Sequence, residues 1–219
     1  MLEFRTVLGE IFESRKKVLL MIETLYMATT EEIKALRDET GVSIMQCKKA
    51  LEEAGGDVEK AKVILRKQSA AIASKKADRT LGAGTVAAYT HAGGAVVAAV
   101  VLGCETDFVS KNEEFQKLAY NIAMHVAAMA PMFKSRADVQ EIDMAAAKAV
   151  FSEEVAKVPE AAREKALQGK LDSYLKERVL LEQPFVKNPE VTIGELITQA
   201  VQKFGEKVEV VRMERLSVK

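Results

Sequence analysis

Apolar residues recur at helical spacing in three short segments between positions 28 and 68. Thr29 and Glu32 have the spacing of a capping box, in which a hydroxyl and a carboxylate take up the free amides at a helix start. Ser43 and Asp57 stand at the corresponding position before the other two segments. The inward-facing residues are Ile33, Leu36, Cys47, Ala50, Leu51, Ala54, Val58, Ala61, Ile64 and Leu65. The pattern predicts a small three-helix bundle over residues 28–68.

A basic stretch separates this bundle from the rest of the chain. Residues 60–79 carry seven Lys or Arg side chains and one acid in an alanine-rich context. We interpret residues 69–83 as a helical or loose linker, and we expect a domain boundary near residue 80.

Strand patterns begin after the linker. Residues 85–90 and 95–103 have the composition of two strands, and the glycines of the intervening segment 91–94 permit a hairpin turn. We therefore expect the two strands to pair antiparallel. A last strand is predicted over residues 208–216.

Amphipathic helices are predicted between the hairpin and the last strand. Ser110 and Glu113 have the spacing of a capping box at the start of one helix, whose apolar face is Phe115, Leu118, Ala119, Ile122, Ala123 and Val126. Residues 138–182 contain alanine-rich helices, and Thr192 opens a further helix with a narrow apolar face. Residues 84–219 are therefore predicted to form an α+β domain in which helices cover a small antiparallel sheet.

Composition excludes several classes of function. The chain has 219 residues, of which 48% are hydrophobic and 29% charged, and its 32 basic and 32 acidic side chains give no net charge. No overall field therefore favours nucleic acid or an anionic membrane as a partner. No apolar run approaches the length of about 20 residues that spans a bilayer. Cys47 and Cys104 form no Cys-x-x-Cys pair, which indicates a reducing compartment, and we expect a cytoplasmic protein.

Motifs of covalent and cofactor chemistry are weak. Residues 82–87 match the dinucleotide pattern G-x-G-x-x-A, but a predicted helix precedes them and a strand follows, the reverse of the order that the motif needs. His91 and His125, the two histidines of the sequence, have no third ligand at metal-like spacing. Cys104 ends an apolar strand beside no basic residue, so we expect a buried thiol. The sequence therefore predicts no catalytic residue, no metal and no cofactor, and hence no enzyme.

The segment 104–110 is the most informative part of the chain. It joins an apolar strand to a capped helix, so its ends are held while its middle, Asp107 and Phe108, projects. The alternative is that Phe108 tucks under the helix and Asp107 helps to cap it. The residues alone leave both interpretations open.

Three separated segments carry a resemblance to a known family. They are LRDETGVSIMQCKKAL at 36–51, CETDFVSKNEEF at 104–115 and LLEQPFVKNP at 180–189. In this order and spacing they resemble bacterial elongation factor Ts, over residues 27 to about 216. The resemblance implies a ubiquitin-associated-like (UBA-like) three-helix domain followed by an α+β core, and a guanine-nucleotide exchange factor for elongation factor Tu in its GDP-bound and nucleotide-free states.

The resemblance also implies two sets of partner-binding residues. A loop that enters the GTPase domain of the partner and disturbs its magnesium and phosphate sites matches Thr106, Asp107, Phe108 and Val109. Contacts from the helical domain match Arg37, Ile44, Met45 and Lys48, for which the alternative is ordinary solvated or packed helix positions. Family members often have two methionines where this chain has Ile44 and Met45, a change that conserves volume. His125 is assigned to the partner-facing side of its helix.

The chain resembles the short form of this family, because it has one Thr-Asp-Phe-Val segment and one Gln-Pro-Phe-Val corner. Short forms resemble a half-core that pairs with itself, so we expect a homodimer through the sheet of the hairpin and terminal strand. Residues 208–219 contain no cysteine, so the dimer should be noncovalent. Residues 1–26 lie outside the resemblance, and we interpret them as an upstream extension, with an amphipathic helix as the alternative.

A rival hypothesis is a non-enzymatic helical-bundle adaptor that binds another protein. Acceleration of GDP release from elongation factor Tu distinguishes the two hypotheses, because an adaptor would bind without speeding release.

Overall fold

The computed structural model describes residues 27–218 and divides into two compact units, Met1–Lys75 and Lys76–Lys219. Both interpretations of residues 1–26, as an upstream extension or an amphipathic helix, lie outside the described residues. Within the described part of the chain, every helix is too short or too polar to cross a lipid bilayer.

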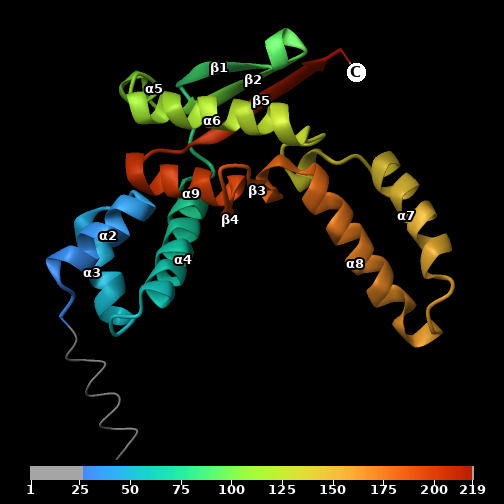
Figure 1. Cartoon of the computed structure of the whole chain (residues 1–219), viewed down its shortest axis with the longest axis horizontal. Helices are drawn as coiled ribbons and strands as arrows, with labels where there is room; N and C mark the ends of the chain where they lie inside the picture. Colours follow the sequence, from blue (N-terminus) through green and yellow to red (C-terminus); the bar gives the residue numbers. More distant parts are fainter. Residues whose placement is uncertain (1–26, 219) are drawn as a thin grey trace, which may run out of the picture. The chain divides into compact units, whose positions relative to one another are not determined.

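The first unit is a bundle of three helices, α2 (Thr30–Thr40), α3 (Ile44–Glu53) and α4 (Val58–Lys76) (Figure 1). The predicted caps are present: Thr29 and Glu32 form a complete capping box, and the amide of Lys60 donates to Asp57 Oδ1 at 3.0 Å. The bundle buries one apolar cluster, which comprises Ile33, Leu36, Val42, Cys47, Ala50, Leu51, Ala61 and Leu65. The predicted three-helix bundle is therefore observed.

Helix α4 is longer than the sequence pattern indicated. It continues to Lys76, so the first part of the expected linker 69–83 is helix, and of the two forms expected for it the loose one is wrong over residues 69–76. The chain divides between Lys75 and Lys76 rather than near residue 80. The difference arises because this half of α4 is rich in Ala and Lys, which favour helix without marking an apolar face.

The second unit is built on a three-stranded antiparallel sheet of order β1-β2-β5, from β1 (Ala83–His91), β2 (Val96–Cys104) and β5 (Glu209–Ser217). The expected hairpin is confirmed, since β1 and β2 pair from Ala83 with Cys104 to His91 with Val96. The turn η1 (Ala92–Gly94) places Gly93 and Gly94 at φ of 65° and 100°, where glycine avoids the strain of a side chain.

Helix α6 (Glu113–Met129) covers one face of this sheet (Figure 1). The core between them is formed by Ala98, Val100, Leu102, Val210, Phe115, Ala119, Ile122, Ala123 and Val126. By the strand register, the opposite face, which we call the outer face, carries Val86, Ala88, Thr90, Val97, Ala99, Val101, Arg212, Glu214 and Leu216. Val86 and Leu216 on this face are 69% and 70% exposed.

The start of α6 differs from the prediction. Ser110 is the last residue of a separate turn, α5 (Asp107–Ser110), and its hydroxyl donates to the Asp107 carbonyl. The side chain of Asn112 caps α6 instead, accepting from the amides of Glu114 and Phe115. The predicted capping box of Ser110 and Glu113 is therefore wrong, because α5 uses Ser110 before α6 begins.

The remaining helices follow the predicted order. α7 (Glu141–Val155) and α8 (Glu160–Arg178) form a helical hairpin, with the short turns η2 (Arg136–Asp138) and η3 (Leu180–Glu182) at its base. A two-stranded ribbon, β3 (Pro184–Phe185) and β4 (Asn188–Thr192), leads into α9 (Ile193–Phe204). The predicted capping box of Thr192 and Glu195 is complete, and the Phe115 and Phe204 rings, 5.7 Å apart, pack α6 against α9. The α+β fold class is confirmed.

Candidate functional site

A short helical turn, α5, stands between β2 and α6 and presents an aromatic side chain to solvent. Phe108 is 84% exposed, an unusual state for a phenylalanine. Val109 beside it is half-buried, and Asp107 is exposed. The interpretation in which Phe108 tucks under the helix is therefore wrong, and we call Asp107 and Phe108 the exposed tip.

The charge at the tip is stabilised locally. The Asp107 carboxylate accepts a hydrogen bond from Lys111 Nζ at 2.7 Å, one helical turn along the chain. This contact lowers the pKa of Asp107 below its ordinary value and so further favours the carboxylate that an exposed aspartate already carries at neutral pH. The tip therefore combines an anion with an exposed aromatic ring.

The base of the tip is tied to the turn between α9 and β5. The amides of Glu105 and Thr106 each donate to Glu206 Oε2 at 3.0 Å, and the Thr106 hydroxyl donates to Glu206 Oε1 at 2.6 Å. In return, the Glu105 carboxylate accepts from the Lys207 amide at 2.6 Å, which is the chief reason that the pKa of Glu105 is lowered. Thr106 therefore directs its hydroxyl toward its own unit.

The thiol of Cys104, which precedes the tip in the sequence, is unreactive because of its environment. Cys104 is fully buried at the end of β2, as the sequence indicated, and donates to the Thr106 carbonyl at 3.2 Å. Burial raises the pKa of this thiol, so it stays protonated near neutral pH.

The second predicted set lies on the three-helix bundle. Ile44 and Met45 begin α3 and are 53% and 74% exposed, which leaves two large apolar side chains beside a buried core. Lys48, one turn after Ile44, is half-buried and pairs with Glu52 at 3.7 Å. Arg37 is exposed on α2. The two predicted sets belong to different units, so each is described by itself.

A comparison with family models decides the identity. The model described as Elongation factor TS matches residues 23–219. The chain belongs to the elongation factor Ts family. Among its relatives, elongation factor Ts of Carboxydothermus hydrogenoformans is 42% identical over 198 residues, which cover 88% of this chain and 89% of the relative. That of Thermosipho melanesiensis is 43% identical, covering 88% of this chain and 99% of the relative. The predicted family is thus confirmed, and it is one of translation elongation factors.

His125 does not lie on the surface of the second unit. Its imidazole is completely buried: Nδ1 accepts from the Val186 amide at 3.2 Å, and Nε2 lies 2.9 Å from Gln183 Oε1. Because Nδ1 is an acceptor, Nε2 carries the proton and donates it to Gln183. The assignment of His125 to the partner-facing side is therefore wrong; it joins α6 to the Gln-Pro-Phe-Val corner.

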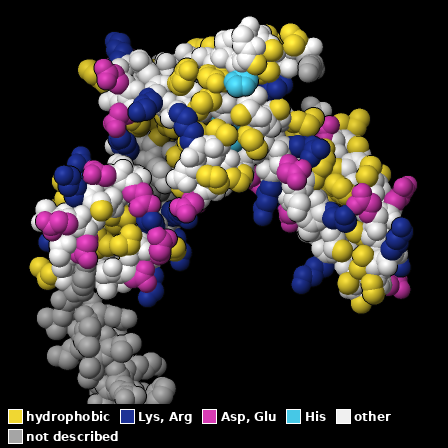
Figure 2. Space-filling model, in the orientation of Figure 1, with side chains coloured by type: hydrophobic (Ala, Val, Ile, Leu, Met, Phe, Trp, Pro, Cys, Tyr) yellow, Lys and Arg dark blue, Asp and Glu magenta, His cyan; other side chains and the backbone are white. Residues whose placement is uncertain are grey.

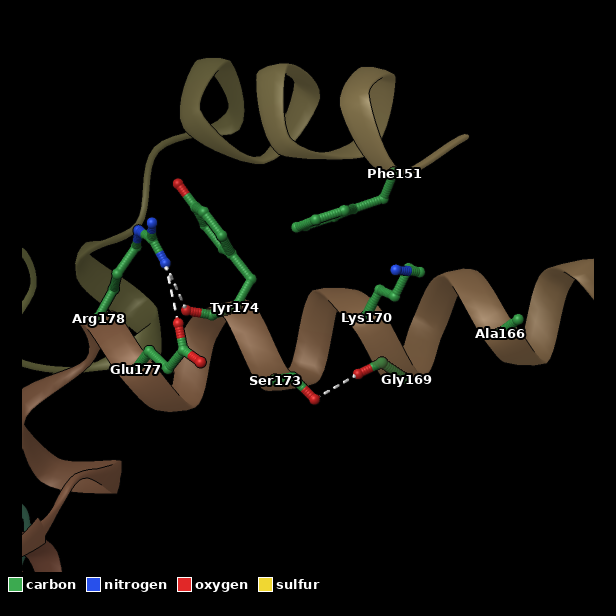
Figure 3. Close-up of a pocket in the computed structure, with 8 residues that line it drawn as sticks. All are labelled: Phe151, Ala166, Gly169, Lys170, Ser173, Tyr174, Glu177 and Arg178. Carbon is green, nitrogen blue, oxygen red and sulfur yellow. Dashed lines mark hydrogen bonds and ion pairs between the residues drawn. The ribbon is translucent and has the colours of Figure 1, made fainter. Parts of the chain in front are cut away.

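A hollow of about 550 Å³ between α7 and α8 has a mixed apolar and charged lining, and each charged side chain of the lining has an ion-pair partner (Figure 3). Lys170 lies 2.6 Å from Glu154, and the Arg178 guanidinium lies over the Tyr174 ring at 3.9 Å. Among the described residues, no group of three or more His, Cys, Asp or Glu side chains has the arrangement of a metal site. On the face shown in Figure 2, basic and acidic side chains are interspersed.

The role of Glu206 in holding the base of the tip was not identified from the sequence. It lies 100 residues from Thr106, and its only local signal is that it follows Gly205, the residue that ends α9 with φ of 70°. A helix stop predicts a turn there, but nothing in the sequence indicates which segment the turn contacts.

Proposed function

We propose that this chain is a cytoplasmic guanine-nucleotide exchange factor for elongation factor Tu, and that it acts by contact alone, without covalent chemistry. The observation that carries the proposal is the exposed tip: Phe108 is 84% exposed and Asp107 ionised on a short turn whose base is hydrogen-bonded. The tip enters the GTPase domain of the partner. There the Asp107 carboxylate competes for charge near the magnesium, and Phe108 displaces apolar packing beside the phosphate-binding loop.

Energetics require more than the tip. Accelerating nucleotide release about ten-thousandfold means lowering the barrier by roughly 5.5 kcal/mol. Burying one Phe side chain contributes only about 1.5 to 3 kcal/mol. The exposed Ile44 and Met45, flanked by Arg37 and Lys48, supply a second contact on the nucleotide-binding domain of the partner. The three-helix bundle thus contributes affinity for the partner, and the tip uses this binding free energy to destabilise the bound nucleotide.

Linkage explains how such a factor cycles. If this chain lowers the affinity of the partner for GDP by a given factor, GDP lowers the affinity of the partner for this chain by the same factor. Fresh nucleotide therefore releases the exchange factor. A factor of this kind needs no cofactor of its own.

We also propose that the chain forms a noncovalent homodimer through its sheet. The outer face is apolar along β2, through Val97, Ala99 and Val101, and the exposed side chains of Val86 and Leu216 extend this apolar area onto the two edge strands. The charged pair on this face, Arg212 and Glu214 of β5, lies 3.0 Å apart. An apolar face of this kind gains free energy when a second copy covers it. Both cysteines are buried, so neither offers an intermolecular disulfide.

Release of a fluorescent GDP analogue from elongation factor Tu tests the exchange function. The unaltered chain should accelerate release, and the Asp107→Ala, Phe108→Ala double variant should lose most of the acceleration. Because both side chains are exposed, the double variant should keep its fold. Ile142→Ala, which truncates another exposed apolar side chain, is the matched control and should retain full activity.

Three results would decide against parts of the proposal. Binding of the partner without acceleration by the unaltered chain would favour the adaptor hypothesis. If the double variant still accelerates release, the role that we assign to the tip is wrong. Turnover of a nucleotide by the chain alone would instead indicate an enzyme.

A further inference from the structure

Two glutamates tie the base of the exposed tip to the turn between α9 and β5 in both directions. Glu206 takes up the amides of Glu105 and Thr106, and the carboxylate of Glu105 takes up the amide of Lys207. Each acid thus binds backbone of the segment that holds the other. The arrangement resembles a helix capping box, but it connects segments about 100 residues apart.

The Glu206 carboxylate is fully engaged inside its own unit. Its two oxygens accept three hydrogen bonds, two from amides at 3.0 Å and one from the Thr106 hydroxyl at 2.6 Å. Hydrogen bonds to an ionised acceptor are among the stronger ones in proteins. Neighbouring groups fix the same region, since Lys76 donates to the Gly205 carbonyl at 2.6 Å and Arg79 pairs with Glu105 at 3.2 Å.

The tip depends on such support because α5 has only four residues. A helix of one turn is unstable by itself, since nucleation fixes several dihedral angles for a single hydrogen bond. On its far side, α5 continues into α6, whose first turn is capped by Asn112. On its near side, the residues before Asp107 are held to the rest of the unit by Glu206 and Glu105.

We propose that Glu206 is a positioning residue for nucleotide exchange: by holding the Glu105 and Thr106 backbone, it presents Asp107 and Phe108 in the conformation that enters the partner. This inference rests on the proposed exchange function. It also gives the threonine that precedes the tip a role other than contact with the partner, because its hydroxyl orients the base of the tip. A tip ordered in advance loses less conformational entropy when it inserts.

Three variants test this role. Glu206→Ala removes all three hydrogen bonds. Glu206→Gln keeps one acceptor oxygen and brings an NH₂ group against donors, so its effect should be intermediate. Glu209→Gln is the matched control, because it removes one carboxylate three residues away whose ion pair is with Lys207, at 3.3 Å, rather than with the base of the tip.

Hydrogen exchange gives a readout that does not depend on the partner. The amides of Glu105 and Thr106 should exchange faster in Glu206→Ala than in the unaltered chain and in Glu209→Gln, while amides in the centre of α6 keep their protection. In GDP-release assays with elongation factor Tu at saturating exchange factor, Glu206→Ala should be slower by about five- to tenfold.

A double-mutant cycle separates positioning from general destabilisation. In the background that lacks both tip side chains, Asp107→Ala with Phe108→Ala, Glu206→Ala should cause little further loss, because Glu206 acts through those two side chains. Full GDP-release activity of Glu206→Ala, or losses that multiply when Glu206→Ala is added to the tip variant, would overturn the inference and leave the exchange function intact. An unaltered chain that fails to accelerate release would instead contradict the proposed function, and the inference with it.

Discussion

The Asp107 carboxylate and the Lys111 ammonium lie 2.7 Å apart, one turn of helix from each other, and both side chains are exposed to solvent. The pair spans the junction of α5 and α6, because Asp107 opens α5 and Lys111 follows its last residue. The same lysine that orients the carboxylate also lowers its pKa below the ordinary value. In the proposed exchange mechanism, this pair presents a carboxylate of fixed direction to the partner.

Replacing Lys111 with Met should therefore raise the pKa of Asp107 toward its ordinary value. The hydrogen bond and charge of Lys111 are the largest causes of the lowered pKa, so the rest of the tip cannot maintain it. A carboxyl-carbon NMR titration of the two proteins measures the change. Lys117→Met, which removes a charge from the exposed side of α6, is the control and should leave the Asp107 titration where it is. An Asp107 titration that does not move in Lys111→Met would show that another group holds the charge.

Truncation of Ile44 and Met45 to Ala should weaken binding to elongation factor Tu by about tenfold while leaving stability nearly unchanged. Both side chains are more than half exposed, so their removal opens no cavity. Leu51→Ala, in the fully buried core of the same bundle, should instead lower the free energy of unfolding by about 2 to 5 kcal/mol. Affinity by titration calorimetry and stability by urea unfolding distinguish the two effects. If the variant with Ile44→Ala and Met45→Ala binds with unchanged affinity, these two side chains of α3 are not part of the interface.

Charge placed on the outer face of the sheet should dissociate the proposed homodimer. Val86→Lys and Leu216→Lys alter side chains that are 69% and 70% exposed in the single chain, so each variant should fold. In a dimer joined through this face, each would bury an unpaired ammonium, which is strongly unfavourable. Light scattering at micromolar concentration should give the mass of a dimer for the unaltered chain and of a monomer for the variants. Val150→Lys, on α7, is the control and should remain dimeric. A monomeric unaltered chain would contradict the proposed dimer itself.

Sequence reasoning succeeded where structure is set by residues three or four positions apart. The caps of Thr29 and Thr192, and the apolar face of α6, are local patterns, and all are present. It failed where two local patterns compete. Ser110 has the spacing of a cap, but the turn that begins at Asp107 includes Ser110, and the cap passes to Asn112.

Contacts between segments that are far apart in the sequence could not be predicted, for a different reason. His125 lies among the apolar positions of α6, and the group that makes its burial favourable, Gln183, is 58 residues away. A polar residue on an apolar face signals either exposure or a hidden partner, and one sequence does not say which. The three-donor site on Glu206 is the same kind of feature: its donors are mostly backbone amides, which leave no trace in residue types.

The buried His125 should make the stability of the second unit depend on pH. Burial lowers the pKa of this imidazole, and its Nδ1 is occupied as an acceptor from the Val186 amide. In the unfolded chain a histidine has a pKa of about 6.5, so between the two pKa values the unfolded state binds the proton that the folded state excludes. Stability is then fully present above about pH 6.5 and falls, by up to about 1.4 kcal/mol per pH unit, as the pH drops toward the folded pKa.

Urea unfolding at pH 7.5 and pH 5.5 measures this dependence. His125→Gln should be less stable at pH 7.5, because it disturbs the hydrogen bonds to Gln183 and Val186, but its stability should change less between the two pH values. His91→Gln, which alters an exposed histidine in the hairpin turn, should keep the pH dependence of the unaltered chain, because His125 is still present. Nitrogen NMR of His125 should also show the proton on Nε2 at neutral pH. If His125→Gln loses as much stability between pH 7.5 and 5.5 as the unaltered chain does, the acid sensitivity arises from other groups, and the buried imidazole is a neutral packing element alone.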